Sequence, residues 1–142
     1  MTILHTLKIY KTLSLWYNTY IGGDIIAGEK NFENRIKRWL VDHGVYPPNT
    51  PKQKIRAKPI GYYEKRFGSQ FSINGLPDMH LCIKGHSIDL ELKDVRGKPS
   101  AAQVKILENI NNWGCEGYLV YPKDWPQIEQ RLLEVINEAK NS

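Results

Sequence analysis

The sequence predicts one α/β domain, a mixed sheet flanked by helices, with elements in the order helix, three strands, helix, strand, helix. Amphipathic patterns typical of helices occupy residues 31–44, 100–113 and 124–142. Short apolar stretches bounded by glycine and proline lie between them. A chain of 142 residues suits one hydrophobic core, so we expect a domain over residues 30–142 and an N-terminal extension over residues 1–29.

The first expected helix begins at Asn31, a good capping residue, and ends at Gly44. Its apolar face comprises Phe32, Ile36, Trp39, Leu40 and His43. We interpret residues 45–51 as a loop and residues 54–68 as strand-like, part of it an edge or bulge, because Pro59 and Gly61 interrupt it. The extension follows neither a helical nor a strand period. It could be an added strand, an arm exchanged between subunits, or a poorly ordered segment.

Two later helices have clear starts. Ser100 and Gln103 have the spacing of a capping box, and the apolar stripe that follows is Val104, Ile106, Leu107, Ile110 and Trp113. A short apolar strand over residues 117–121 precedes the last helix. Asp124 can cap that helix, with Pro126 in its first turn. Its inward residues are Ile128, Leu132, Val135, Ile136 and Ala139.

Composition narrows the class of protein. The net charge of +5 favours a polyanionic partner such as nucleic acid. Two cysteines far apart make no disulfide framework. No apolar run approaches the roughly 20 residues that span a bilayer, and the N-terminus lacks the pattern of a signal peptide. We therefore expect an intracellular protein without membrane association.

Three carboxylates stand in residues 75–93, which otherwise resemble buried strands, although acidic residues are depleted in strands. A hairpin that turns at Lys84 and Gly85 would place alternate residues on opposite faces. Met79 then pairs with Leu90, and Leu81 with Ile88, on one apolar face. On the other face Asp78 comes opposite Glu91, His80 comes opposite Asp89, and Lys93 lies one step beyond Glu91.

Such a pairing of Asp78 with Glu91 needs compensation. Residues directly opposite have Cβ atoms about 5 Å apart, and two negative charges at that distance repel by roughly 3 kcal/mol at an effective dielectric of about 20. A shared proton, a cation or displacement of one side chain would offset the repulsion. A divalent ion suits two carboxylates with partial water coordination, so the pattern predicts a hard-cation site with a lysine beside it.

These residues resemble the PD-(D/E)xK nucleases, and more closely their VRR-NUC branch, the virus-type replication–repair nucleases. The resemblance covers roughly residues 30–140. It consists of Glu33 in the first helix, then Gly75, Pro77 and Asp78, then Glu91, Leu92 and Lys93, then Lys98, Pro99 and Gln103. It implies a restriction-endonuclease-like fold and Mg²⁺- or Mn²⁺-dependent hydrolysis of DNA, branched or junction DNA above all. It also implies viral or phage origin and a homodimer.

The resemblance assigns catalytic roles to Glu33, Asp78, Glu91 and Lys93 and also places Gln103 in the active site. Asp78, Glu91 and the backbone carbonyl of Leu92 would bind the metal ion, and Glu33 would act on it through water. Lys93 would position the attacking water or neutralise charge on the phosphate.

Simpler interpretations stay open beside these roles. Glu33 can pair with Lys37 on the helix surface, Glu91 can form a plain salt bridge with Lys93, and the capping box alone explains Gln103. Asp89 is expected to pair with His80 or a basic neighbour.

Contacts with DNA are expected from Ser72, Lys65, Arg66, Arg96 and Lys98. Two other functions remain: a non-catalytic DNA-binding module on the same fold, and an RNA-processing nuclease.

Overall fold

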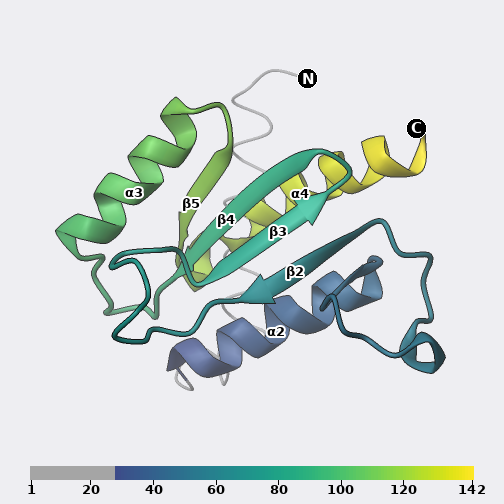
Figure 1. Ribbon diagram of the computed structural model, residues 1–142, viewed down its shortest axis with the longest axis horizontal. Helices are drawn as coiled ribbons and strands as arrows, with labels where there is room; N and C mark the ends of the chain where they lie inside the picture. Colours follow the sequence, from purple (N-terminus) through teal and green to yellow (C-terminus); the bar gives the residue numbers. More distant parts are fainter. Residues whose placement is uncertain (1–27) are drawn as a thin grey trace.

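The computed structural model describes residues 28–142 (Figure 1). Its α-helices are α2 (Gly28–Asp42), α3 (Ala101–Asn112) and α4 (Trp125–Lys140), and its strands are β1 (Val45–Tyr46), β2 (Gly61–Lys65), β3 (Met79–Ile83), β4 (His86–Leu92) and β5 (Glu116–Val120). Short 3-10 turns cover Lys52–Lys54 and Pro122–Asp124. The mixed α/β class is confirmed. The expected extension lies outside the described residues, apart from its last two positions, which begin α2.

The sheet has the order β1-β2-β3-β4-β5 within the described residues. Strand β3 pairs antiparallel with both β2 and β4. At the two edges, β1 pairs with β2 and β5 pairs with β4 in parallel. The short strand β1 falls where we expected a loop. Its two residues are both buried, so tertiary packing recruits a segment whose prolines argue against a longer strand.

The hydrophobic core lies between one face of the sheet and the helices α2 and α4. Met79, Leu81, Ile88 and Leu90 are all 0% exposed and belong to it, as the hairpin pattern predicted. The two helices meet through Trp125, whose ring lies edge-on to Phe32 and Trp39, with ring centroids 6.4 and 5.5 Å apart. All five expected inward residues of α4 are buried.

Helix α3 lies alongside β5 and covers the opposite face (Figure 1). Its capping box with Ser100 is confirmed, but most of its expected apolar stripe is not buried. Only Leu107 is fully buried, while Val104 and Trp113 are 40% and 75% exposed. The helix approaches the sheet at Gly117, where the side chains of Leu107 and Ile110 pack, and Trp113 lies beyond this contact.

Two expected helix caps are wrong. Helix α2 begins at Gly28, a turn earlier than expected, so Asn31 lies inside it. Asp124 precedes α4 but makes no cap hydrogen bond to it, because its Oδ2 accepts from the backbone amide of Tyr121 at 3.1 Å. None of the described helices combines the length and apolarity that crossing a membrane requires.

We predict that Gly75→Ala destabilises the protein more than Gly85→Ala does. Both glycines have φ near +88°, where a side chain costs roughly 1–2 kcal/mol. A Cβ on Gly75 would also lie 2.7 Å from the backbone carbon of Ala102 in α3, whereas Gly85 has open space. The difference in unfolding free energy, measured in urea, should be about 1 kcal/mol or more. Equal losses would mean that Gly75 is not packed against α3.

Candidate active site

The hairpin of β3 and β4 has the register expected from the sequence. Met79 pairs with Leu90, His80 with Asp89 and Leu81 with Ile88, and the turn uses Lys84 and Gly85 with φ of 37° and 89°. One residue beyond the ladder, this register sets Asp78 opposite Glu91. Both acids therefore lie at the same end of the sheet, on the face that α3 covers.

Asp78 is held by two neighbouring elements. Its Oδ2 accepts a hydrogen bond from the backbone amide of Leu92 at 2.8 Å, which ties the start of β3 to the end of β4. Its Oδ1 lies 3.3 Å from Nζ of Lys65 on β2. A carboxylate fixed in this way has a defined orientation before any ligand binds.

Glu91 is the most deeply buried carboxylate of the described residues, at 1% exposure. Its Oε1 accepts from Nζ of Lys93 at 3.0 Å and from Nε2 of Gln103 at 2.6 Å. Its Oε2 is buried and has no hydrogen-bond partner of normal geometry in the described chain. An unpaired buried carboxylate oxygen is costly, so this atom has unused capacity to bind a ligand.

Burial raises the pKa of Glu91, and the negative charge of Asp78 acts in the same direction. The hydrogen bond and charge of Lys93 oppose the rise, as does the backbone amide of Asp78, but they do not cancel it. The surroundings of Glu91 therefore disfavour its ionised form relative to a carboxylate in water.

Gln103 serves two of the expected roles at once. Its Oε1 accepts from the backbone amide of Ser100 at 2.8 Å, which completes the capping box, while its Nε2 donates to Glu91. The first turn of α3 is thus tied directly to β4. The cap and the site were alternatives in the sequence, but one amide group satisfies both.

Glu33 is buried rather than on the surface, and two lysines surround it. Lys37 Nζ lies 2.5 Å from Oε1, and Lys65 Nζ lies 2.9 Å from Oε2. Burial acts to raise the pKa of Glu33, but the hydrogen bonds and charges of Lys37 and Lys65 outweigh it and lower the pKa. The expected pair with Lys37 is present, and Lys65 connects Glu33 to Asp78. Among the described residues Glu33 forms its ion pairs with Lys37 and Lys65 and not with a group of Glu91, and Lys65, paired with Met79, comes from the core face.

A third buried acid, Asp89, organises basic groups beside this site. Its Oδ1 lies 2.8 Å from Nη1 of Arg66 and 3.1 Å from Nδ1 of His80, so the expected pairing is confirmed. Arg66 also lies 3.5 Å from the carbonyl of Pro77. The sequence suggested a DNA contact for Arg66 but contained no signal that Asp89, 23 residues away, would orient it.

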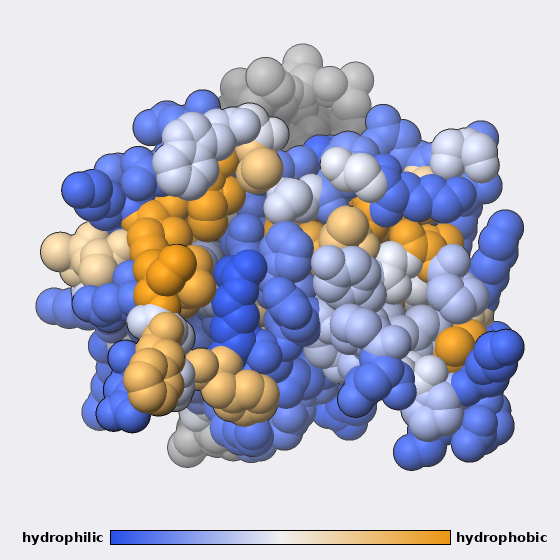
Figure 2. Space-filling view, in the orientation of Figure 1, coloured by the Kyte–Doolittle hydropathy of each residue, from blue (hydrophilic) through white to orange (hydrophobic). Residues whose placement is uncertain are grey.

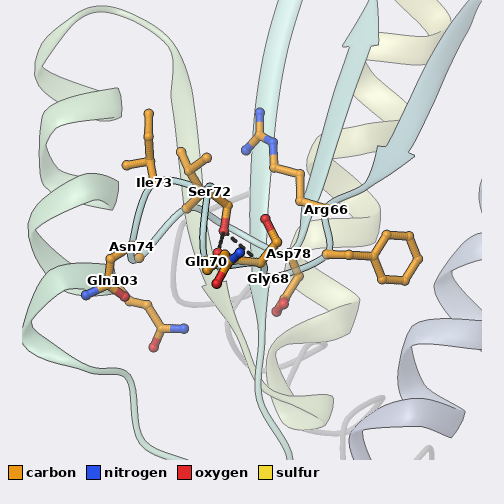
Figure 3. Close-up of a pocket in the computed structure, with 12 residues that line it drawn as sticks. Arg66, Gly68, Gln70, Ser72, Ile73, Asn74, Asp78 and Gln103 are labelled. Atoms are coloured by element: carbon orange, nitrogen blue, oxygen red, sulfur yellow. Dashed lines mark hydrogen bonds between the residues drawn. The ribbon is translucent and has the colours of Figure 1, made fainter.

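Two of the site residues, Asp78 and Gln103, line a cleft of about 740 Å³ (Figure 3). Figure 3 shows Asn74 and Gln103 on one side and Arg66 and Asp78 on the other. Most of the lining comes from the loop between β2 and β3, where the sequence indicated DNA contacts only for Arg66 and Ser72. Ser72 lines the cleft, but its hydroxyl is engaged with Ser69 rather than with a carboxylate of the site.

The remaining expected DNA contacts, Arg96 and Lys98, are exposed in the connection from β4 to α3. The backbone amide of Arg96 donates to Oδ1 of Asp94 at 3.0 Å, which shapes this connection. Neither residue lines the cleft.

The donor groups fit a hard cation that keeps part of its water shell. Within residues 28–142, no three side chains of histidine, cysteine, aspartate or glutamate gather to hold an ion by themselves. Mg²⁺ is commonly bound through one or two carboxylates completed by water and substrate phosphates. Asp78, the unpartnered Oε2 of Glu91 and the carbonyl of Leu92 would form such a partial set.

Comparisons with family models, curated proteins and solved structures found no match to this chain.

We predict that Glu91→Gln stabilises the metal-free protein at neutral pH. Because the folded pKa of Glu91 is raised above its usual 4.5, its contribution to stability is present below pH 4.5 and is lost as pH rises through the folded pKa. The variant's advantage in urea unfolding with EDTA should therefore appear above pH 4.5 and vanish below it. Lower stability of the variant at pH 8 would contradict the prediction.

Glu116→Gln is the control of opposite sign. A hydrogen bond from Arg131 is the main cause that lowers the pKa of Glu116, so its stabilisation is present above pH 4.5 and is lost as pH falls through the folded pKa. This variant should be less stable than the parent at neutral pH, and the difference should shrink in acid.

Proposed function

We propose that this protein is a metal-dependent endonuclease of the PD-(D/E)xK type, on a restriction-endonuclease-like fold of the VRR-NUC branch. Its proposed reaction is hydrolysis of phosphodiester bonds in DNA, with branched or junction DNA as substrate. The observation that carries the proposal is the pairing of Asp78 with a buried Glu91 that has one unpartnered oxygen and a lysine on the other. The mixed five-stranded sheet is compatible with this fold.

The proposed reaction divides between the ion and the side chains. When bound, Mg²⁺ or Mn²⁺ would supply stabilisation of phosphate charge and a lower pKa for an attacking water. Asp78 and Glu91 would hold the ion, and Leu92 would contribute its carbonyl. Lys93, 3.0 Å from Glu91, is placed to donate to a phosphate oxygen or to orient the water, as preorganised donors do in other phosphoryl-transfer sites.

Gln103 and Lys65 act as positioning residues. Gln103 fixes one oxygen of Glu91 and leaves the other available. Lys65 holds Oδ1 of Asp78 and neutralises Glu33, so Glu33 supports Asp78 through Lys65. This differs from a direct role of Glu33 on metal-bound water, and it makes Glu33 a part of the framework in the ion-free protein.

The surroundings of the site suit a polyanion. The chain carries a net charge of +5, and the guanidinium of Arg66 is fixed by Asp89 where it lines the cleft. A fixed guanidinium is well suited to bind phosphate. A homodimer, as the resemblance implies, would present two such clefts to two strands.

We predict that Glu91→Gln and Lys93→Ala each reduce DNA cleavage in Mg²⁺ or Mn²⁺ by about 100-fold or more, since the first removes a proposed metal ligand and the second a donor to the phosphate or the attacking water. Labelled linear, flapped and four-way DNA, and an RNA duplex, would be digested at one stated salt concentration. Glu108→Gln and Lys105→Ala, exposed on α3, are the matched controls and should cut as the parent does. Parental cutting by either site variant would refute the assigned roles.

A non-catalytic DNA-binding module is the second candidate. The carboxylates of Glu33, Asp78 and Glu91 already have basic or amide partners, and Oε2 of Glu91 is the exception. The negative charges are therefore largely balanced without an ion. This candidate expects DNA binding that does not depend on Mg²⁺ and no product from any substrate.

Binding of Ca²⁺ to the protein without DNA separates the two candidates further. An ion whose free concentration is 100 times its dissociation constant stabilises the folded protein by about 2.7 kcal/mol. The nuclease proposal expects this stabilisation in the parent and its loss in Asp78→Asn and Glu91→Gln. Equal stabilisation of all three proteins would place the ion elsewhere.

A further inference from the structure

The loop between β2 and β3 exposes large apolar side chains beside the cleft. Phe67, Phe71 and Ile73 are 78%, 88% and 68% exposed, although side chains of this kind are usually buried. Phe67 and Ile73 line the cleft, and Phe71 lies between the lining residues Gln70 and Ser72. Single exposed apolar residues are common, but three within seven positions of one loop indicate a contact surface. Figure 2 shows hydrophobic surface gathered in the region where this loop lies, beside largely hydrophilic surface.

The loop is fixed at both ends to the residues of the candidate site. At its start, the backbone amide of Arg66 donates to the carbonyl of Asp78 at 2.7 Å. At its end, Gly75 packs so closely on Ala102 and Gln103 of α3 that no Cβ would fit. The positions of the exposed rings are therefore coupled to the same framework that holds Asp78 and Gln103.

Hydrogen bonds inside the loop define its middle. The hydroxyl of Ser72 accepts from the amide of Ser69 at 2.9 Å and donates to its carbonyl at 2.8 Å. The amide of Phe71 donates to the hydroxyl of Ser69 at 3.3 Å. This turn presents Phe71 outward at little further ordering cost, which favours binding.

We propose that Phe67 and Phe71 stack on unpaired bases of the DNA strand whose phosphate enters the cleft. This inference rests on the proposed function, because it assigns the recognition of unpaired DNA to the same site. Stacking of bases on aromatic rings is tolerant of sequence, and paired bases inside a duplex cannot reach the rings. Arg66, which lines the same cleft next to Phe67, provides the complementary charge for the backbone. A mixture of aromatic and cationic groups fits single-stranded nucleic acid better than an apolar protein segment.

The test measures DNA binding by the full chain in EDTA, where cleavage is not needed. Anisotropy gives the affinity for single-stranded, flapped and duplex DNA, and 2-aminopurine placed at the unpaired positions reports stacking through its fluorescence. Phe71→Ala, and Phe67→Ala with it, should weaken binding to unpaired DNA by roughly 5- to 100-fold and abolish the fluorescence change, with duplex affinity unchanged.

Two further variants identify the cause. Phe71→Tyr keeps an aromatic ring and should bind as the parent does, while Phe71→Leu keeps only apolar bulk and should behave as Phe71→Ala. Trp113→Ala is the matched control, since Trp113 is an aromatic residue 75% exposed at the far end of α3 from Gln103. Parental binding by Phe71→Leu, or equal losses on duplex and unpaired DNA, would overturn the inference in favour of a protein contact or a general effect.

The two proposals fail separately. A parent protein that cuts no DNA with Mg²⁺ or Mn²⁺, yet loses stacking in Phe71→Ala, would refute the nuclease and retain the base-binding loop. A parent that cuts DNA while the loop variants bind unpaired bases as the parent does would refute the loop and retain the nuclease.

Discussion

The structure around the candidate site depends on one buried negative charge, the carboxylate of Glu91. A carboxylate removed from water is stable only when other groups replace its solvation. Lys93 supplies the charge and Gln103 supplies a hydrogen bond, both to the same oxygen. The second oxygen has neither in the described chain. Burial raises the pKa of Glu91 despite the contacts with Lys93, and perturbed pKa values of this kind are frequent where a protein binds a cation or performs catalysis.

The groups that compensate the site charges also hold the fold together. Gln103 ties α3 to β4, Asp78 ties the start of β3 to the end of β4, and Lys65 ties β2 to α2. Gln103 and Lys65 join helices to the sheet, and Asp78 extends the contact of β3 with β4 beyond their backbone ladder. The same contacts therefore contribute to stability and to the proposed chemistry. They also keep the site carboxylates in fixed positions when no ion is bound. The nuclease and the binding module differ in whether Oε2 of Glu91 binds a metal ion that acts on a substrate.

Local pattern predicted most of the fold because its physical causes are local. Strand alternation with a glycine turn was enough for the register of Met79 against Leu90, and the spacing of Ser100 and Gln103 was enough for the capping box. The errors arose where packing between distant segments decides. Trp113 continues a helical stripe but lies beyond the sheet that α3 contacts, so it is exposed. Asn31 has capping chemistry, yet the helix starts earlier.

By itself, the sequence determined which residues share a face of the β3–β4 hairpin, and hence that Asp78 and Glu91 lie near each other with Lys93 alongside. Only the tertiary structure decided that Lys65 joins Glu33 to Asp78, that Asp89 orients Arg66, and that one oxygen of Glu91 stays unpartnered. The reason is that periodicity follows from backbone geometry within one element. Partners from separate elements are chosen by how helices and loops pack on the sheet, which no spacing along the chain encodes.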